Sequence, residues 1–261
     1  MENISSNPYQ APESDLNTPT DEQNLAFGEP QKRPAGKGTD WIKSAFLLFK
    51  QSPGTWILTM ILGFIIVIVT NLIPVVGSIF GFVTTYIWTA GLIYGSSQQD
   101  KGLPFKVSYL FSGFKLAPGK LIGLSVAMGV LSMLIMLICM GPMIFDMMMG
   151  QFDETSLDTD PLQFILYFLI AMALMLPLMM ATWFAPALII FHQFGLIRAM
   201  KYSFMACLKN FVAFLVYGLV FFLIMIIAMI PAGLGMLVVV PMLYASMYTA
   251  YKDIFLREQA E

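Results

Sequence analysis

The sequence predicts an all-α integral membrane protein with six transmembrane helices, three cytoplasmic interfacial amphipathic helices and a disordered N-terminal tail. Of the 261 residues, 58% are hydrophobic and only 11% are charged, whereas soluble domains carry about a quarter charged residues. From Trp41 onward, long apolar runs alternate with short polar breaks. The basic residues fall only in alternate breaks, which indicates a chain that crosses a membrane repeatedly.

Residues 1–40 are predicted to form a disordered cytoplasmic tail. They hold seven of the sixteen acidic residues and are rich in Pro, Asn, Ser and Gln. Such a segment cannot bury enough apolar surface to offset the entropy lost on ordering. It also lacks the apolar core of a cleavable signal peptide, so the first span is expected to direct insertion. The transmembrane domain is predicted to cover 41–255, and 256–261 to form a short cytoplasmic C-terminal tail.

Six apolar segments are long enough to cross roughly 30 Å of hydrocarbon. Tight turns at 74–77 and 231–233 and an acidic loop at 150–160 join them in pairs. The fourth segment contains Pro177 and Pro186, which membrane helices tolerate when neighbours satisfy the freed carbonyls. The predicted spans are 55–73, 78–98, 121–147, 162–191, 211–230 and 234–251.

Three segments next to the spans show apolar stripes at helical spacing with basic residues on the other side. Helices of this kind lie in the headgroup plane with the apolar face toward the hydrocarbon. The stripes are Trp41, Ala45, Leu48 and Phe49; Val107, Leu110, Phe111 and Phe114; and Leu196, Met200, Phe204 and Leu208. The basic residues expected to contact lipid headgroups are Lys43, Lys50, Lys115, Arg198, Lys201 and Lys209.

The charge distribution predicts the orientation. All fourteen Lys and Arg residues lie in 1–54, 99–120, 192–210 and 252–261, which six spans place on one side of the membrane. The opposite side has no basic residue. Because cytoplasmic loops carry the excess of Lys and Arg, both termini are predicted to be cytoplasmic.

The spans also suggest a threefold internal pattern. An apolar residue and a lysine stand just before the first, third and fifth spans, at Phe49-Lys50, Phe114-Lys115 and Leu208-Lys209. Pro-Gly follows the first two junctions and not the third. The pattern predicts an internal repeat; the alternative is that any hairpin entering a membrane needs an apolar and basic boundary.

Several short motifs resemble an uncharacterised bacterial family of six-span inner-membrane proteins. That family is more distantly similar to the membrane domain found with some glycerophosphodiester phosphodiesterases. The resemblance covers roughly 35–255 and implies the six-span fold, but it implies no activity. The motifs are Trp41-Ile42-Lys43, Leu48-Phe49, Pro53-Gly54, Leu110-Phe111-Ser112-Gly113-Phe114, Trp183-Phe184-Ala185-Pro186-Ala187 with His192, and Tyr251-Lys252-Asp253-Ile254-Phe255, with Asn7-Pro8-Tyr9 and Ala11-Pro12 near the start.

Two polar residues are candidate functional groups. His192, the single histidine, lies at the cytoplasmic end of the fourth span and is interpreted as an interfacial residue or a pH-sensitive contact. Asp146 is the one carboxylate inside a predicted span, near its outer end, where a transport role is the alternative to simple solvation. Met140, Met143 and Met147 share a face beside it, and packing is favoured over a Cu(I) site. Cys139 and Cys207 are interpreted as free apolar residues.

No nucleophile and base pair, metal cluster or nucleotide motif is evident, so no enzyme, cofactor or metal site is predicted. The favoured function is a non-enzymatic scaffold or accessory protein of the bacterial inner membrane. The alternative is a small transporter for an apolar or lipid-like solute, based on Asp146 and the proline-broken fourth span. The expected partners are membrane lipids and an unidentified membrane protein, and no nucleic acid.

Overall fold

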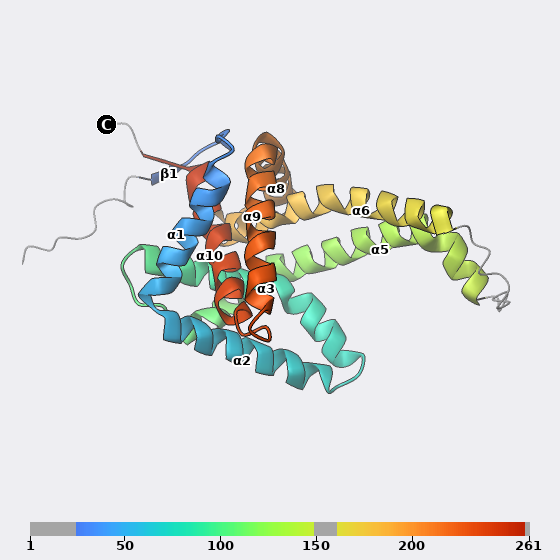
Figure 1. Ribbon diagram of the computed structural model, residues 1–261, viewed down its shortest axis with the longest axis horizontal. Helices are drawn as coiled ribbons and strands as arrows, with labels where there is room; N and C mark the ends of the chain where they lie inside the picture. The colour runs from blue at the N-terminus through green and yellow to red at the C-terminus, as the bar shows by residue number, and fades with distance from the viewer. Residues whose placement is uncertain (1–24, 149–160, 259–261) are drawn as a thin grey trace, which may run out of the picture.

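The computed structural model describes residues 25–148 and 161–258, and it is almost entirely helical (Figure 1). Asp146 lies in a helix, but its side chain, those of the neighbouring methionines 140, 143 and 147, and the loop 150–160 lie outside the described part. The elements are β1 (Leu25–Phe27), α1 (Lys37–Gln51), α2 (Pro53–Asn71), α3 (Val76–Asp100), η1 (Val107–Phe111), α4 (Gly113–Leu116), α5 (Pro118–Met148), α6 (Pro161–Trp183), α7 (Ala185–His192), α8 (Leu196–Lys209), α9 (Phe211–Met229), α10 (Met236–Phe255) and β2 (Leu256–Glu258).

Five of the predicted spans are long and apolar enough to cross a membrane. They are Pro53–Asn71, Val76–Asp100, Pro118–Cys139, Ile165–His192 and Phe211–Met229. The fourth is divided at Phe184, because Pro186 has no N–H to continue the hydrogen-bond ladder of α6. The sixth predicted span corresponds to α10, and its crossing of the membrane stays a prediction.

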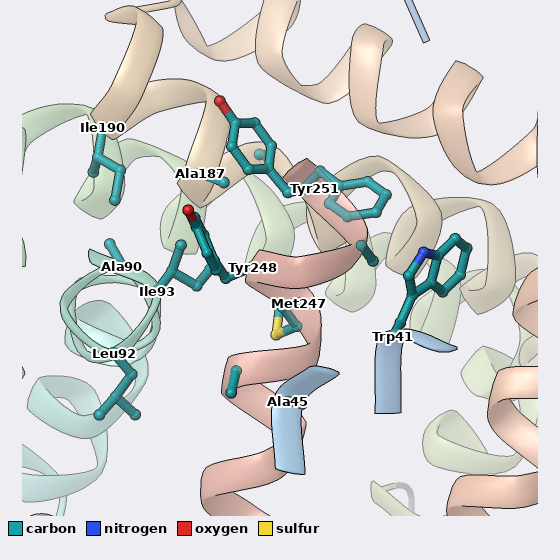
Figure 2. Close-up of a cluster of buried hydrophobic side chains, with 14 of the residues drawn as sticks. Trp41, Ala45, Ala90, Leu92, Ile93, Ala187, Ile190, Met247, Tyr248 and Tyr251 are labelled. Carbon is teal, nitrogen blue, oxygen red and sulfur yellow. The ribbon is translucent and has the colours of Figure 1, made fainter. Parts of the chain in front are cut away.

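α10 is the central helix of the fold. It contacts α1, α2, α3 and α9. Figure 2 shows side chains of its C-terminal half, including Met247, Tyr248 and Tyr251, between residues of α1, α3 and α7. Most of its second half is buried, including Ser246 and Ile254. The most apolar helix, α9, is instead largely exposed, as expected for a helix that faces lipid.

The helices form three hairpins, α2–α3, α5–α6 and α9–α10, as the alternation of spans and loops predicts. Figure 1 shows α5–α6 and α2–α3 extending away from the end of the molecule where β1 and β2 lie. β1 and β2 are antiparallel, with Phe27 opposite Leu256. The two described ends of the chain therefore meet on one side, away from the tips of these two hairpins.

Two of the three junctions that open the hairpins have nearly the same backbone conformation. Ser52, before Pro53, has φ −148° and ψ 56°, and Ala117, before Pro118, has φ −159° and ψ 54°. Asn210, before α9, differs, with φ −111° and ψ 23°. A residue before proline is kept out of the helical region by the proline ring, which breaks the chain into an elbow at the first two junctions.

The predicted surface helices differ from expectation in their surroundings. The stripe on α1 is buried, with Trp41 only 2% exposed, but it faces α10 and α9 rather than lipid. The 107–114 stripe forms a 3₁₀ turn and a one-turn helix instead of a continuous helix. Leu110 in this segment is buried, whereas Phe111 and Phe114 remain partly exposed beside Trp88.

α8 packs on α6 through its small residues, Ala199, Ser203, Ala206 and Cys207. The hydroxyl of Ser203 accepts a hydrogen bond from the N–H of Phe184 at 2.9 Å and donates to the carbonyl of Met180 at 2.7 Å. Ser203 thereby satisfies backbone groups that the break between α6 and α7 leaves unpaired. Of the large apolar stripe of α8, Leu208 is exposed, whereas Leu196, Met200 and Phe204 are half-buried.

Some of the glycines in the predicted spans allow close packing between segments. A Cβ on Gly91 of α3 would lie 2.4 Å from the carbonyl oxygen of Leu110, and a Cβ on Gly129 would meet the ring of Phe82. Gly63, Gly81 and Gly123 instead have open space where a Cβ would project. Close backbone approach occurs where α3 meets η1 and also where α1 meets α9, since a Cβ on Gly38 would lie 2.3 Å from the carbonyl oxygen of Ala213.

Candidate functional site

The four segments that carry the basic residues meet in one polar layer. Salt bridges and hydrogen bonds connect 25–54, 99–120, 192–210 and 252–258. The links are Arg33 to Asp253, Lys252 to Asp100, Lys120 to Gln193 and Lys209 to Pro30. Segments that the positive-inside rule places on one side of the membrane are thus neighbours in space.

Asp253, at the end of α10, is one centre of this layer. Its carboxylate lies 3.3 Å from Nε of Arg33 and accepts a hydrogen bond of 2.9 Å from the indole N–H of Trp41. Arg33 also donates to the backbone carbonyl of Asp253, from Nε at 3.0 Å. Charge-assisted bonds of this kind are about twice as strong as neutral ones, and they tie the N-terminal segment and α1 to α10.

Asp100, at the end of α3, is the second centre. Its Oδ2 atom lies 2.5 Å from Nζ of Lys252 and accepts a hydrogen bond of 2.8 Å from the hydroxyl of Tyr248. The preceding residue, Gln99, is buried; it accepts from the indole N–H of Trp56 at 3.0 Å and donates to the carbonyl of Leu48 at 2.7 Å. These bonds fix the end of α3 to α10 and to the elbow between α1 and α2.

The segment 25–33, here called the N-terminal strap, is bound across this layer. The N–H groups of Gly28 and Gln31 donate to the carbonyls of Phe255 and Ile254 at 2.8 and 3.0 Å. The side chain of Asn210 donates to the carbonyl of Gln31 at 2.8 Å and accepts from the N–H of Arg33 at 2.6 Å. The expected tail of 1–40 is therefore too long, because 25–33 form the strap, which includes β1, and α1 begins at Lys37. Residues 1–24 lie outside the described part of the chain.

His192 belongs to an aromatic cluster that holds the strap. The ring of Phe27 lies between His192, at 4.3 Å between centroids, and Phe255, at 5.8 Å. Nε2 of His192 and the hydroxyl of Tyr251 share a hydrogen bond of 2.5 Å. The histidine thus contacts protein groups, and the alternative interpretation, a pH-sensitive contact with lipid phosphate or a partner, stays untested.

The six basic residues predicted to contact lipid headgroups are all exposed, but their surroundings differ. Lys50 lies over the ring of Phe46 at 5.6 Å, and the guanidinium of Arg198 lies over the ring of Phe194 at 4.1 Å. Lys209 donates to the strap at 3.3 Å. Lys43 is 3.9 Å from Asp40, an exposed pair of little energetic weight. Lys201 lines an apolar groove.

The described residues form two other hollows besides the groove that Lys201 lines. A polar cavity of about 620 Å³ lies between the strap, α1 and α10, with Arg33, Asp100 and Lys252 in its wall. An apolar groove of about 750 Å³ lies between α2, α3 and the turn before α10. Gly63 and Gly81 line this groove. Within 25–148 and 161–258, no three His, Cys, Asp or Glu residues come together as metal ligands would.

Sequence reasoning missed Asp100, Asp253 and Asn210 as organising residues. Each is a polar residue at the boundary of a predicted span, where charged residues are common and need no partner. The sequence did contain one indication: Asp253 and Asp100 are the acidic residues closest to the spans on the side that carries the Lys and Arg residues. Their partners come from distant segments, so no local spacing reveals them.

No protein-family model and no solved structure matches the chain. It is similar to a protein of Burkholderia thailandensis named a probable inner membrane protein, with 25% identity over 252 aligned residues that cover 85% of this chain and 92% of the relative. This likeness and the five apolar helices support an integral, multi-pass protein of the inner membrane. They agree with an uncharacterised membrane protein family, and they do not show the more distant likeness to the phosphodiesterase-associated domain.

Proposed function

We propose that this protein is a non-enzymatic membrane scaffold or accessory protein that presents its hairpins to other membrane proteins. The proposal rests on the contrast between the polar layer of the protein and its exposed spans. The polar layer fastens the hairpins together at one end, whereas only 11% of the span in α2 and 22% of that in α9 is buried within the protein. Helices in a membrane associate through packing and small residues, and α2 offers Gly63 in open space for such contact.

A second function, transport of an apolar or lipid-like solute, is favoured by the apolar groove between α2 and α3. Its threonines, among them Thr59, Thr70 and Thr84, donate to carbonyls of their own helices, so the wall presents satisfied polar groups. A groove of this volume is within the usual range for small-molecule sites. Transport would in addition require the break at Pro186 or the carboxylate of Asp146 to take part.

Photocrosslinking in native membranes followed by mass spectrometry tests the scaffold. A photoreactive residue at Phe64 or Phe222, which are 66% and 58% exposed on α2 and α9, is expected to capture the same partner protein reproducibly. The matched control is the same residue at Ile87, which is buried and should capture only this chain. If the exposed positions yield lipid adducts and no protein, the scaffold proposal is wrong and the transporter gains support.

We also propose that both termini are cytoplasmic, and cysteine labelling in intact cells tests this. Ser156→Cys is expected to react with an impermeant maleimide, whereas Lys43→Cys should react only after the membrane is opened. The native cysteines should give little background, because both are buried and burial raises the pKa of the Cys207 thiol to about 12. Labelling of Lys43→Cys in intact cells would contradict the proposal and place the termini on the outer side of the membrane.

A further inference from the structure

A third hollow, of about 670 Å³, opens between α5, α6 and α8. One face of α8 forms one side of it, and residues of α5 and α6 form the other. Its wall is apolar except for a single charged side chain. The lining residues are Ala127, Val130, Leu131, Ala181, Leu196, Ile197, Met200, Lys201 and Phe204. We call this hollow the α8 groove.

Lys201 is the charged residue in the α8 groove. It forms no salt bridge with any residue of 25–148 or 161–258, and its side chain is exposed. The neighbouring cations on α8 are engaged differently, since Arg198 lies over Phe194 and Lys209 donates to the strap. An ammonium group beside an apolar wall suits a ligand that has an anionic group and a hydrocarbon chain.

The α8 groove begins on α5 at Ala127, seven residues after Lys120 of the polar layer. Lys120, near the start of α5, donates to the carbonyl of Gln193 just before α8, at 2.7 Å. From Lys120, Leu131 is eleven residues further along α5, or about 16 Å at the rise of an α-helix. On α5 the lining residues run from Ala127 to Leu131, about 6 Å of helix, so the hollow can hold part of an acyl chain beside the ammonium of Lys201.

We propose that the α8 groove binds an anionic phospholipid of the cytoplasmic leaflet. The ammonium of Lys201 contacts the lipid phosphate, and one acyl chain lies along Ala127, Leu131 and Ala181. Charge complementarity favours an anionic lipid over a zwitterionic one, and the apolar wall favours a lipid over free phosphate. The assignment of the leaflet rests on the proposed cytoplasmic orientation of α8, but the binding does not rest on the scaffold function.

The test compares thermal stabilisation of the purified full-length protein by phosphatidylglycerol and by phosphatidylcholine. Wild type is expected to bind phosphatidylglycerol preferentially, and Lys201→Gln to lower this preference about fivefold, the weight of one surface lysine. Lys201→Arg should retain the preference. Lys43→Gln is the control, because Lys43 is also an exposed lysine but lies on α1, away from the α8 groove.

A second variant tests the chain-binding wall. Ala127→Leu places a larger side chain at a half-buried position in the wall of the groove. It should therefore reduce the amount of phospholipid that stays bound in native mass spectrometry. Helical content should be unchanged, because leucine is also a good helix former. Inorganic phosphate alone should stabilise none of the variants. Equal phosphatidylglycerol preference in wild type and Lys201→Gln, or equal loss in Lys43→Gln, would overturn the site. The scaffold is judged separately by crosslinking at Phe64.

Discussion

Replacing Trp41 with alanine is expected to lower the free energy of unfolding by about 3–5 kcal/mol, the usual cost of truncating a buried tryptophan. The indole is 2% exposed and lies against Phe214 at 5.1 Å and Tyr217 at 6.3 Å between ring centroids. The change leaves a cavity between α1 and α9. It also removes the N–H that donates to Asp253.

Two control variants separate packing from the hydrogen bond. Trp41→Phe keeps most of the packing but loses the N–H that donates to Asp253, so it should cost about 1 kcal/mol. Leu47→Ala, on the same helix but 61% exposed, should change stability little if that face meets lipid. Chemical unfolding in detergent micelles, followed by circular dichroism, measures all three variants. An equal loss in Trp41→Ala and Leu47→Ala would contradict the assigned burial of α1.

Replacing Gly91 with alanine is expected to destabilise the protein by about 1–3 kcal/mol, the typical cost of overpacking. The added Cβ would lie 2.4 Å from the carbonyl oxygen of Leu110 and 2.6 Å from that of Tyr109. Both are backbone atoms, so no side chain can rotate away. η1 would have to shift relative to α3, and this shift would disturb the contact between Trp88 and Phe111.

Gly123→Ala is the matched control for Gly91→Ala. A Cβ at Gly123 has nothing within 4 Å, and alanine improves helix propensity by up to about 1 kcal/mol. We therefore expect this variant to be neutral or slightly more stable in the same unfolding measurement. If Gly91→Ala behaves like Gly123→Ala, the close approach of α3 and η1 does not exist in the folded protein.

The apolar periodicity predicted most of the helices and their pairing into hairpins. It also identified the correct buried face of α1, since Trp41, Ala45, Leu48 and Phe49 are all buried. It did not reveal what covers that face. A stripe of apolar side chains avoids water equally well against lipid or against α10, so the pattern alone cannot distinguish an interfacial helix from a packed one.

The polar groups were the part that sequence reasoning could not place. The strap was assigned to a disordered tail because its composition is polar, yet its N–H groups find acceptors at the end of α10. Asp100 and Asp253 looked like ordinary boundary residues. Their partners Lys252 and Arg33 lie more than 150 positions away, so no local pattern could reveal the polar layer.

By itself, the sequence determined the class of the protein, because long apolar runs suit helices that satisfy their own backbone groups in hydrocarbon, and the distribution of Lys and Arg follows from insertion. Hydrophobicity and charge are sums over individual residues, so both can be obtained from the sequence without knowing which segments are in contact. The tertiary structure alone decided that α10 is central, that the strap is bound, and that Lys201 borders an apolar groove. These features depend on directional contacts between distant segments, and such contacts exist only once the hairpins have come together.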